Sequence, residues 1–363
     1  MYDPSRRDTH PVLPFACASC PQKALDRCDG PSNNKTYLMQ GASLVSCIDL
    51  GRREIYFGDT YDDFIPLPES SHQDNLTLPS FIPGIAKGLR ISLPQRPNAI
   101  YAISLSKIVG CGGNVVIDSL DVLREKLGLP FGARLALVGT AKDCILEALW
   151  KVSDTDHSWE KIARLGFDFV VGLSYSVWDE QPRLDQIRNQ DRNLQIHDRF
   201  ANLGVPSIPF LYPFDDSDYR AVFKWLGDRP DINKVAILAQ YYKKPHQFRQ
   251  LLRNMRAIQD GAKRPLEFVV VGAAKQNKIA ALMNEFAATV ITWKPFQAAL
   301  HGLRTTENLH HPPGDILRLG MSREELVTHN IERYFGRCEE LRQAGSKRRR
   351  LGKELPDGKN KVA

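Results

Sequence analysis

The stretch Leu266-Glu267-Phe268-Val269-Val270-Val271, followed after Gly272 by the amphipathic run Lys275–Phe286, is typical of a buried strand and the helix that packs on it. The apolar residues of this strand run continuously instead of alternating, as expected when both faces of a parallel sheet are covered. The helical run supplies the crossover connection that parallel strands need. The stretch therefore predicts an α/β fold.

The same strand–helix pattern occurs seven times between residues 99 and 303, which favours a TIM-barrel-like (β/α) repeat over the alternative, a doubly wound open sheet. The expected strands are Ile100–Leu105, Arg134–Val138, Phe167–Leu173, Ser207–Leu211, Val235–Ala239, Leu266–Val271 and Thr289–Trp293. The expected helices are Ser119–Leu127, Lys142–Val152, Pro182–Leu203, Tyr219–Leu226, His246–Asp260, Lys275–Phe286 and Pro295–Leu303. An eighth strand is expected at Asn114–Ile117 or within the N-terminal part. No G-x-G-x-x-G or G-x4-G-K-[ST] motif follows a strand, which disfavours a dinucleotide site or a P-loop.

Four segments are expected along the chain. Residues 1–98 form an N-terminal extension with cysteines, residues 99–303 the α/β barrel, and residues 304–345 a C-terminal helical segment. In that third segment a helix begins at Ser322, with Glu325 in the capping-box position. Residues 346–363 are basic and poor in apolar residues, so we expect a disordered tail.

The positive charge of the chain is concentrated in that tail. Residues 346–363 carry a net charge of +5 of the +7 of the whole chain. Such a run can hold the phosphates of a nucleic acid without reading its sequence, or it can simply keep the terminus soluble. No apolar run reaches the length of a membrane span, and the first residues show no signal-peptide core, so we expect a cytoplasmic protein with no membrane partner.

Four cysteines near the N-terminus form the pattern Cys17-x2-Cys20-x7-Cys28, with Cys47 further on. A C-x2-C pair in a turn-rich segment is typical of a metal knuckle, so zinc and an iron–sulfur cluster are both expected cofactors. Disulfides or unrelated buried cysteines are the alternatives. The odd total of seven cysteines disfavours disulfides.

In a barrel, the active face lies at the carboxyl ends of the strands, and the residues there are polar, aromatic and cationic. Asp143 and Asp215 are the candidate general bases or nucleophiles, although Asp215 is better explained as a helix cap. Aromatic rings can stack on a base or sugar, and lysines can contact a phosphate. The other catalytic candidates are Lys142 and Tyr175, and the substrate-binding candidates are Trp178, Arg188, Arg192, Tyr212, Tyr241, Lys243 and Lys294. Ser174, Ser176, Gln240, Tyr242 and Trp293 are also expected at strand ends, without an assigned role.

The expected helix Pro182–Leu203 has an apolar stripe that Asp191 interrupts. Arg188, Arg192 and Arg199 lie alongside this stripe. A buried Asp191 needs a partner, and an arginine one turn away on the same helix could provide it. An internal ion pair is the favoured interpretation, and an arginine face toward a ligand phosphate is the alternative.

The segment from Trp159 to Trp178, WEKIARLGFDFVVGLSYSVW, leads to Pro182, a long helix with Gln186-Ile187-Arg188-Asn189 and Arg192-Asn193, and then Gly204-Val205-Pro206. Over residues 140–272 this pattern resembles an uncharacterised bacterial and phage family, the domain of unknown function 4417. The resemblance implies a barrel-like fold and a bacterial or mobile-element context, and it implies no activity.

The sequence therefore favours a nucleic-acid-associated α/β-barrel protein that modifies a base or nucleotide, with a metal or cluster at its N-terminal cysteines. The alternatives are a barrel enzyme for a small phosphorylated metabolite and a non-catalytic binding protein.

Overall fold

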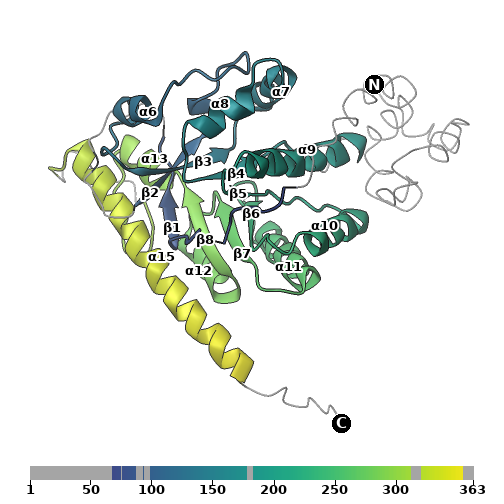
Figure 1. Cartoon of the computed structure of the whole chain (residues 1–363). Helices are drawn as coiled ribbons and strands as arrows, with labels where there is room; N and C mark the ends of the chain where they lie inside the picture. Colours follow the sequence, from purple (N-terminus) through teal and green to yellow (C-terminus); the bar gives the residue numbers. More distant parts are fainter. Residues whose placement is uncertain are drawn as a thin grey trace, which may run out of the picture.

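The structure is a computed structural model that describes residues 68–74, 76–86, 93, 99–177, 183–311 and 320–354. In these residues the strands are β1 (Phe81–Pro83), β2 (Ile100–Ser104), β3 (Arg134–Gly139), β4 (Phe169–Leu173), β5 (Ser207–Ile208), β6 (Lys234–Leu238), β7 (Glu267–Val271) and β8 (Ala287–Thr292). The helices are the short η2 (Leu105–Lys107), then α6 (Leu120–Leu127), α7 (Asp143–Val152), α8 (Ser158–Arg164), α9 (Arg183–Asn202), α10 (Asp216–Asp228), α11 (Pro245–Ala262), α12 (Gln276–Glu285), α13 (Lys294–Leu300) and α15 (Arg323–Glu354). The helices surround the strands (Figure 1).

The strands form two four-stranded parallel sheets, with the orders β1-β8-β7-β6 and β2-β3-β4-β5. The α/β class with parallel sheets is thus confirmed, as are the strands and helices expected between residues 99 and 303. Neighbouring strands in each sheet are consecutive in the chain, apart from β1 beside β8. In the first sheet Val270 of β7 pairs with Ile237 of β6 on one side and with Val290 of β8 on the other.

Among the described strands, regular pairing is interrupted between β1 and β2 and between β5 and β6. At each of these two edges a single parallel bridge links the two sheets. Gly84 bridges to Ala102, where Ile85 N donates to Ala102 O at 2.9 Å. At the other edge, Phe210 bridges to Ala236, and Leu211 N donates to Ala236 O at 3.0 Å.

The eighth strand comes from the N-terminal part. Phe81–Pro83 pairs with β8, whereas Val115, in the other expected position, forms only an isolated antiparallel bridge with Val109. The α/β unit therefore begins before residue 99, and the expected boundary at residue 98 is corrected.

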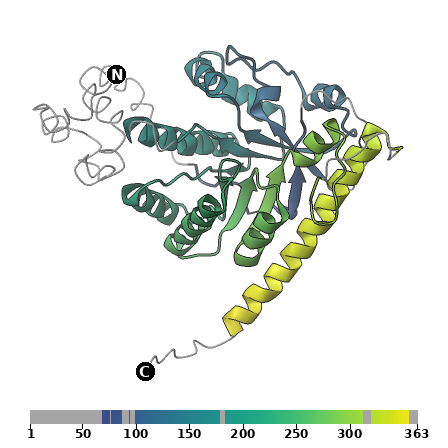
Figure 2. The same ribbon diagram turned by 180° about the vertical axis from the view of Figure 1, so that it is seen from behind.

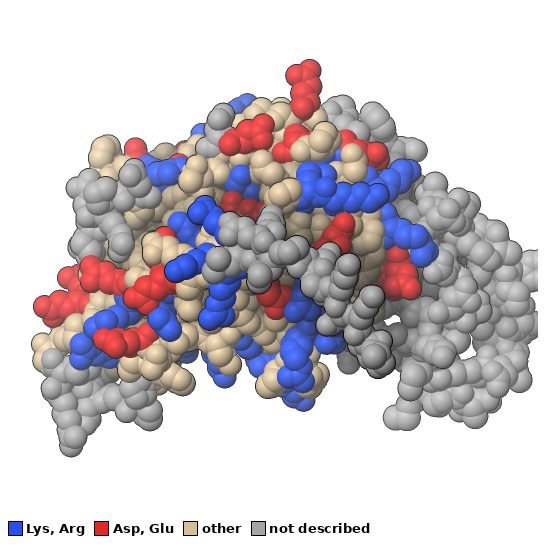
Figure 3. All heavy atoms as spheres, turned by 90° about the horizontal axis from the view of Figure 1, so that it is seen from below, with Lys and Arg blue, Asp and Glu red and all other residues tan. Residues whose placement is uncertain are grey.

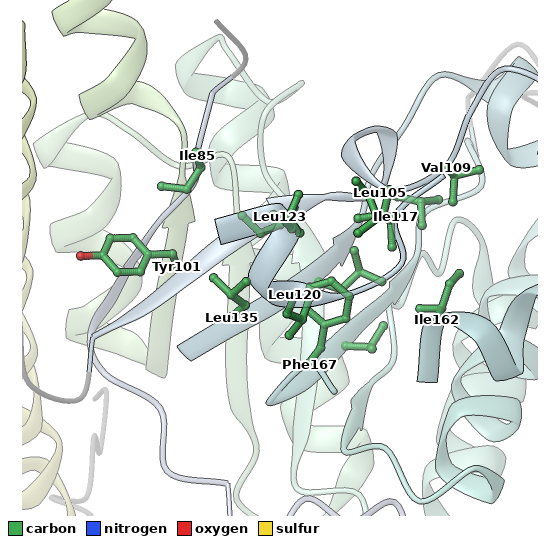
Figure 4. Close-up of a cluster of buried hydrophobic side chains, with 14 of the residues drawn as sticks. Ile85, Tyr101, Leu105, Val109, Ile117, Leu120, Leu123, Leu135, Ile162 and Phe167 are labelled. Carbon is green, nitrogen blue, oxygen red and sulfur yellow. The ribbon is translucent and has the colours of Figure 1, made fainter. Parts of the chain in front are cut away.

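Three apolar clusters form the core. One lies between the two sheets and contains side chains of both, including Ala102, Phe169, Ala236 and Val269. A second lies between the sheet β2–β5 and its helices, where side chains of α6, β2 and β3 converge (Figure 4). The third lies between the other sheet and α10, α11, α12 and α15. Each sheet thus packs helices on one face and the other sheet on its second face.

The long helix α15 runs along one side of the molecule, and its lower end extends past the other helices (Figures 1 and 2). Its first turn has the expected capping box, because Ser322 N donates to Glu325 Oε2 and Glu325 N donates to Ser322 Oγ. Residues 346–354 continue the helix, so the expectation of disorder is wrong for them. None of the helices in the described residues has the length and apolarity needed to cross a membrane.

Candidate functional site

The amino ends of the strands are covered by the segment that precedes β1. Gln73 Nε2 donates to Ser207 O at 2.6 Å, and Gln73 Oε1 accepts from Lys234 N at 2.7 Å. Leu76 and Leu78 complete the cluster between the sheets at this end. The partly buried side chains that pack against this cluster, Tyr212 and Trp293, follow β5 and β8 at the opposite, carboxyl end of the strands.

At the carboxyl end, Tyr212 and Trp293 close the cluster between the sheets, and both are half-buried. The hydroxyl of Tyr212 lies 2.6 Å from Ser174 Oγ, and its ring stacks on Phe210 with 5.7 Å between centroids. Burial raises the pKa of Tyr212 above its usual value, although the hydrogen bond with Ser174 opposes the shift. The phenol thus stays protonated near neutral pH and can act as a hydrogen-bond donor.

Trp293 lies where β1 and β8 end. A Cβ atom at Gly84 would come within 2.5 Å of the indole Cδ2, so the ring occupies the space that a side chain at residue 84 would fill. Glycine at this position therefore allows the indole to lie close to the backbone of the neighbouring strand.

The loop after β6 adds further aromatic and cationic groups. Tyr241 is 48% exposed, Tyr242 is half-buried and Lys243 is exposed. Besides burial, which is the main cause, Tyr242 and Tyr241 contribute to the raised pKa of Tyr212. Lys278 of α12 fixes the loop, since its Nζ donates to Tyr242 O and, at 3.3 Å, to Lys243 O.

A carboxylate lies at the ends of β3 and β4. Ser176 Oγ donates to Asp143 Oδ1 at 2.8 Å, and Asn189 Nδ2 donates to Ser176 O at 2.7 Å. Asp143 and Lys142 are exposed at the start of α7, and Arg188 of α9 is half-buried. Because Ser174 contacts Tyr212 while Ser176 contacts Asp143, the loop after β4 brings the two groups to the same end of the strands.

Two residues that the sequence places in the site, Tyr175 and Arg192, are buried and make contacts inside the protein. Tyr175 is 1% exposed, and its hydroxyl donates to Leu146 O at 2.8 Å. The Arg192 guanidinium lies over the rings of Trp150 and Tyr175, at 4.8 and 4.9 Å, and pairs with Glu147 at 2.8 Å. A ligand outside the protein does not reach these buried groups, so we remove both from the candidate site. Glu147 of α7 is thus an ion-pair partner of Arg192.

Two other candidates lie near helix starts. Asp215 caps α10, accepts from the backbone N of Ser217 and Asp218, and forms a capping box with Asp218. The cap was the favoured interpretation of Asp215 and is confirmed. Lys294, the first residue of α13, is half-buried beside His311. Burial, and then the charge of Lys294, lower the pKa of His311 to about 4.

Trp178 and the cysteines Cys17, Cys20, Cys28 and Cys47 lie outside the described residues. Within the described residues, no three His, Cys, Asp or Glu side chains gather in a way that could hold a metal ion. The candidate site thus consists of Tyr212, Tyr241, Lys243, Lys294, Asp143, Lys142 and Arg188, with Ser174, Ser176 and Trp293 as residues whose contacts the sequence did not indicate.

Comparison with protein-family models gives no match for this chain, and comparison with curated proteins gives none either. The resemblance to the domain of unknown function 4417 therefore rests on the sequence motifs alone.

Proposed function

We propose that the protein is a nucleic-acid-associated α/β-barrel protein whose strand ends bind a nucleobase or nucleotide for modification. A barrel, in which the two sheets are halves of one ring, is supported by the bridges at both sheet edges. It is also supported by the apolar cluster between the sheets. A doubly wound sheet would instead carry helices on both faces.

The observation that carries the proposal is the pair of half-buried aromatic residues Tyr212 and Trp293 at the carboxyl end, with the Tyr212 hydroxyl held by Ser174. Aromatic rings stack on bases of any sequence, at about 1–3 kcal/mol per base. The paired hydroxyls of Ser174 and Tyr212 can exchange hydrogen bonds with the polar edge of a base. The exposed Tyr241 and Lys243 extend the same end toward a sugar and a phosphate.

Asp143 is the group we assign to the chemistry. It is an exposed carboxylate at the strand ends, and the hydrogen bond from Ser176 fixes its orientation. A carboxylate held in this way can accept a proton from a base or a water molecule, or attack as a nucleophile. Lys142 and Arg188 would then balance the charge of a phosphorylated substrate.

We further propose that Cys17, Cys20, Cys28 and Cys47 hold zinc or an iron–sulfur cluster with a structural role. The C-x2-C spacing supports this assignment. Elemental analysis and an absorbance spectrum of anaerobically purified full-length protein test it, with Cys20→Ser as the variant that should lose the metal. A metal-free wild type would refute the site.

A single substitution tests the strand-end site. We expect Tyr241→Ala to weaken binding of a short labelled single-stranded DNA or RNA by roughly tenfold, because one stacking platform is lost. Phe131→Ala is the matched control, since Phe131 is 86% exposed but lies just before β3, at the amino end of the strands. Equal effects of the two substitutions, or no binding by the wild type, would overturn the proposal.

The second candidate is a barrel enzyme for a small phosphorylated metabolite. This candidate is favoured by the position of the basic end of α15. Arg342 Nη1 donates to Leu78 O, so the basic end lies beside the segment before β1 and away from the carboxyl ends of the strands. Binding of nucleoside monophosphates without binding of oligonucleotides would select this candidate.

A further inference from the structure

The basic run that the sequence presents as a loose tail is helical and attached to the body of the protein. Gly345 packs against the backbone of Met283, and the Arg349 side chain donates to Met283 O. Three residues before Gly345, the side chain of Arg342 donates to Leu78 O. About two turns before Gly345, Cys338 is fully buried. These contacts fix the rotation of α15 about its axis.

The register then decides which basic side chains face outward. Residues 338, 342, 345 and 349 share one side of a helix that turns by about 100° per residue. Lys347 lies on the opposite side and Arg348 and Arg350 on the two flanks, and all three are exposed. Arg349 is the only one of the four consecutive basic residues directed at the body.

Among the side chains that the structure describes, no neighbouring acid pairs with these outward cations. On the preceding turns, Glu339 pairs with Arg342 and Glu340 pairs with Arg337. Among the described residues, no ion pair or hydrogen bond is recorded for Lys347, Arg348 or Arg350. Seen from below (Figure 3), the molecule carries Lys and Arg side chains interspersed with Asp and Glu.

We propose that Lys347, Arg348 and Arg350 form a rigid docking surface, the α15 arm, for the phosphate backbone of nucleic acid. This inference rests on the proposed association with nucleic acid and gives that association a place in the fold. Three cations held within one helical turn neutralise phosphates without reading bases. A membrane surface fits less well, because Leu351 is the single large apolar residue in 346–354 and an interfacial helix needs an apolar face.

The α15 arm and the strand-end site lie at opposite ends of the strands. Tyr334 OH donates to Ala274 O, just past the carboxyl end of β7, whereas Arg349 contacts Met283 near the end of α12. At about 1.5 Å per residue, Arg348 lies roughly 20 Å along the helix from Tyr334. The arm is therefore a tether for the polymer and not a part of the strand-end site.

The test compares two charge-matched variants of the full-length protein. Lys347→Gln, Arg348→Gln and Arg350→Gln are combined in one variant. The control combines Lys126→Gln, Lys151→Gln and Lys224→Gln, which are exposed lysines on α6, α7 and α10. Binding of a labelled DNA duplex is measured by fluorescence anisotropy at several salt concentrations, and circular dichroism checks the helical content of each variant.

We expect the arm variant to reduce the slope of log affinity against log salt by about 3, and the affinity at low salt by at least tenfold. The control should change the slope by less than about 1. This inference would be overturned if the slope changed equally in the two variants or stayed unchanged in the arm variant. Binding of anionic phosphatidylserine vesicles in place of DNA would also overturn it. If the wild type binds the duplex with an unchanged slope in the arm variant, only the arm is refuted. If the wild type binds no nucleic acid, the proposed function fails as well.

Discussion

The hydroxyl groups of Ser174 and Tyr212 lie 2.6 Å apart and join the ends of β4 and β5. They stand at the carboxyl end of the apolar cluster that the two sheets share. This hydrogen bond fixes the ring of Tyr212. It also places two hydroxyl groups at the end of the strands, where they can form hydrogen bonds with a ligand.

Tyr212→Phe removes this hydrogen bond and keeps the ring that stacks on Phe210. We expect the free energy of unfolding to fall by about 1 kcal/mol, the usual net contribution of a hydrogen bond. Oligonucleotide affinity should fall by roughly tenfold, because the ligand loses a donor. Urea denaturation and anisotropy titration measure the two effects. Ser174→Ala and the double variant complete a mutant cycle, and fully additive losses of stability would show that the two hydroxyls do not interact.

Two glycines of α15 should respond to alanine with opposite signs. Alanine stabilises a helix by about 1 kcal/mol relative to glycine. At Gly336 a Cβ meets nothing within 4 Å, so Gly336→Ala should stabilise the protein. At Gly345 the Cβ overlaps the Met283 carbonyl, a backbone group that cannot move away cheaply.

Gly345→Ala should therefore destabilise the protein by about 1–3 kcal/mol, because overpacking exceeds the gain in helix propensity. Thermal unfolding of both variants checks the signs. Stabilisation by both would mean that the end of α15 is not docked on α12 as described.

Arg192 should matter for stability and not for binding. A lysine in its place lacks the planar, multi-donor guanidinium that lies over the rings of Trp150 and Tyr175 while it pairs with Glu147. We expect Arg192→Lys to lower the free energy of unfolding by about 2 kcal/mol, with unchanged oligonucleotide affinity. A loss of affinity at unchanged stability would return Arg192 to the phosphate-binding role that the sequence allowed.

His197 should make the protein sensitive to acid. Burial, and then the positive charge of Arg229, lower its pKa to about 3, against about 6.5 in an unfolded chain. Above pH 6.5 the ring is neutral in both states. Between about pH 6.5 and 3 only the unfolded chain binds the proton, so stability falls by up to about 1.4 kcal/mol per pH unit as the pH decreases.

His197→Phe removes this effect and should keep the packing on Trp225. Neither ring nitrogen of His197 has a hydrogen-bond partner in the described residues, so the substitution breaks no such bond there. Denaturant titrations from neutral to acidic pH should show a shallower loss of stability in the variant. Parallel curves for the two proteins would mean that His197 is protonated in the folded state.

The sequence predicts the regular elements well where the apolar runs are long. The run Leu266–Val271 becomes β7 because continuous burial leaves a distinct pattern. β1 was expected in the N-terminal part but could not be located there, because it has three residues, too few for a period, and ends in Pro83. The helical state of residues 346–354 was missed because it depends on Met283, a contact more than sixty residues away in the chain.

The sequence predicted which residues follow the strands better than it predicted the contacts that their side chains make. Tyr212 and Tyr175 both follow strands, yet Tyr212 remains half-buried at the carboxyl end whereas Tyr175 donates to Leu146 O inside the fold. That difference depends on the direction of each side chain after the strand ends, which composition and spacing do not contain. The pairing of Ser174 with Tyr212 likewise requires two adjacent parallel strands in register.

Photo-cross-linking tests the strand-end site most directly. The full-length protein is irradiated with a single-stranded oligonucleotide that carries a thio-substituted base, and the linked peptides are identified by mass spectrometry. The proposed site predicts cross-links of the base to peptides that contain Tyr212, Tyr241 or Trp293. Cross-links confined to residues 347–350, with none at the strand ends, would contradict it.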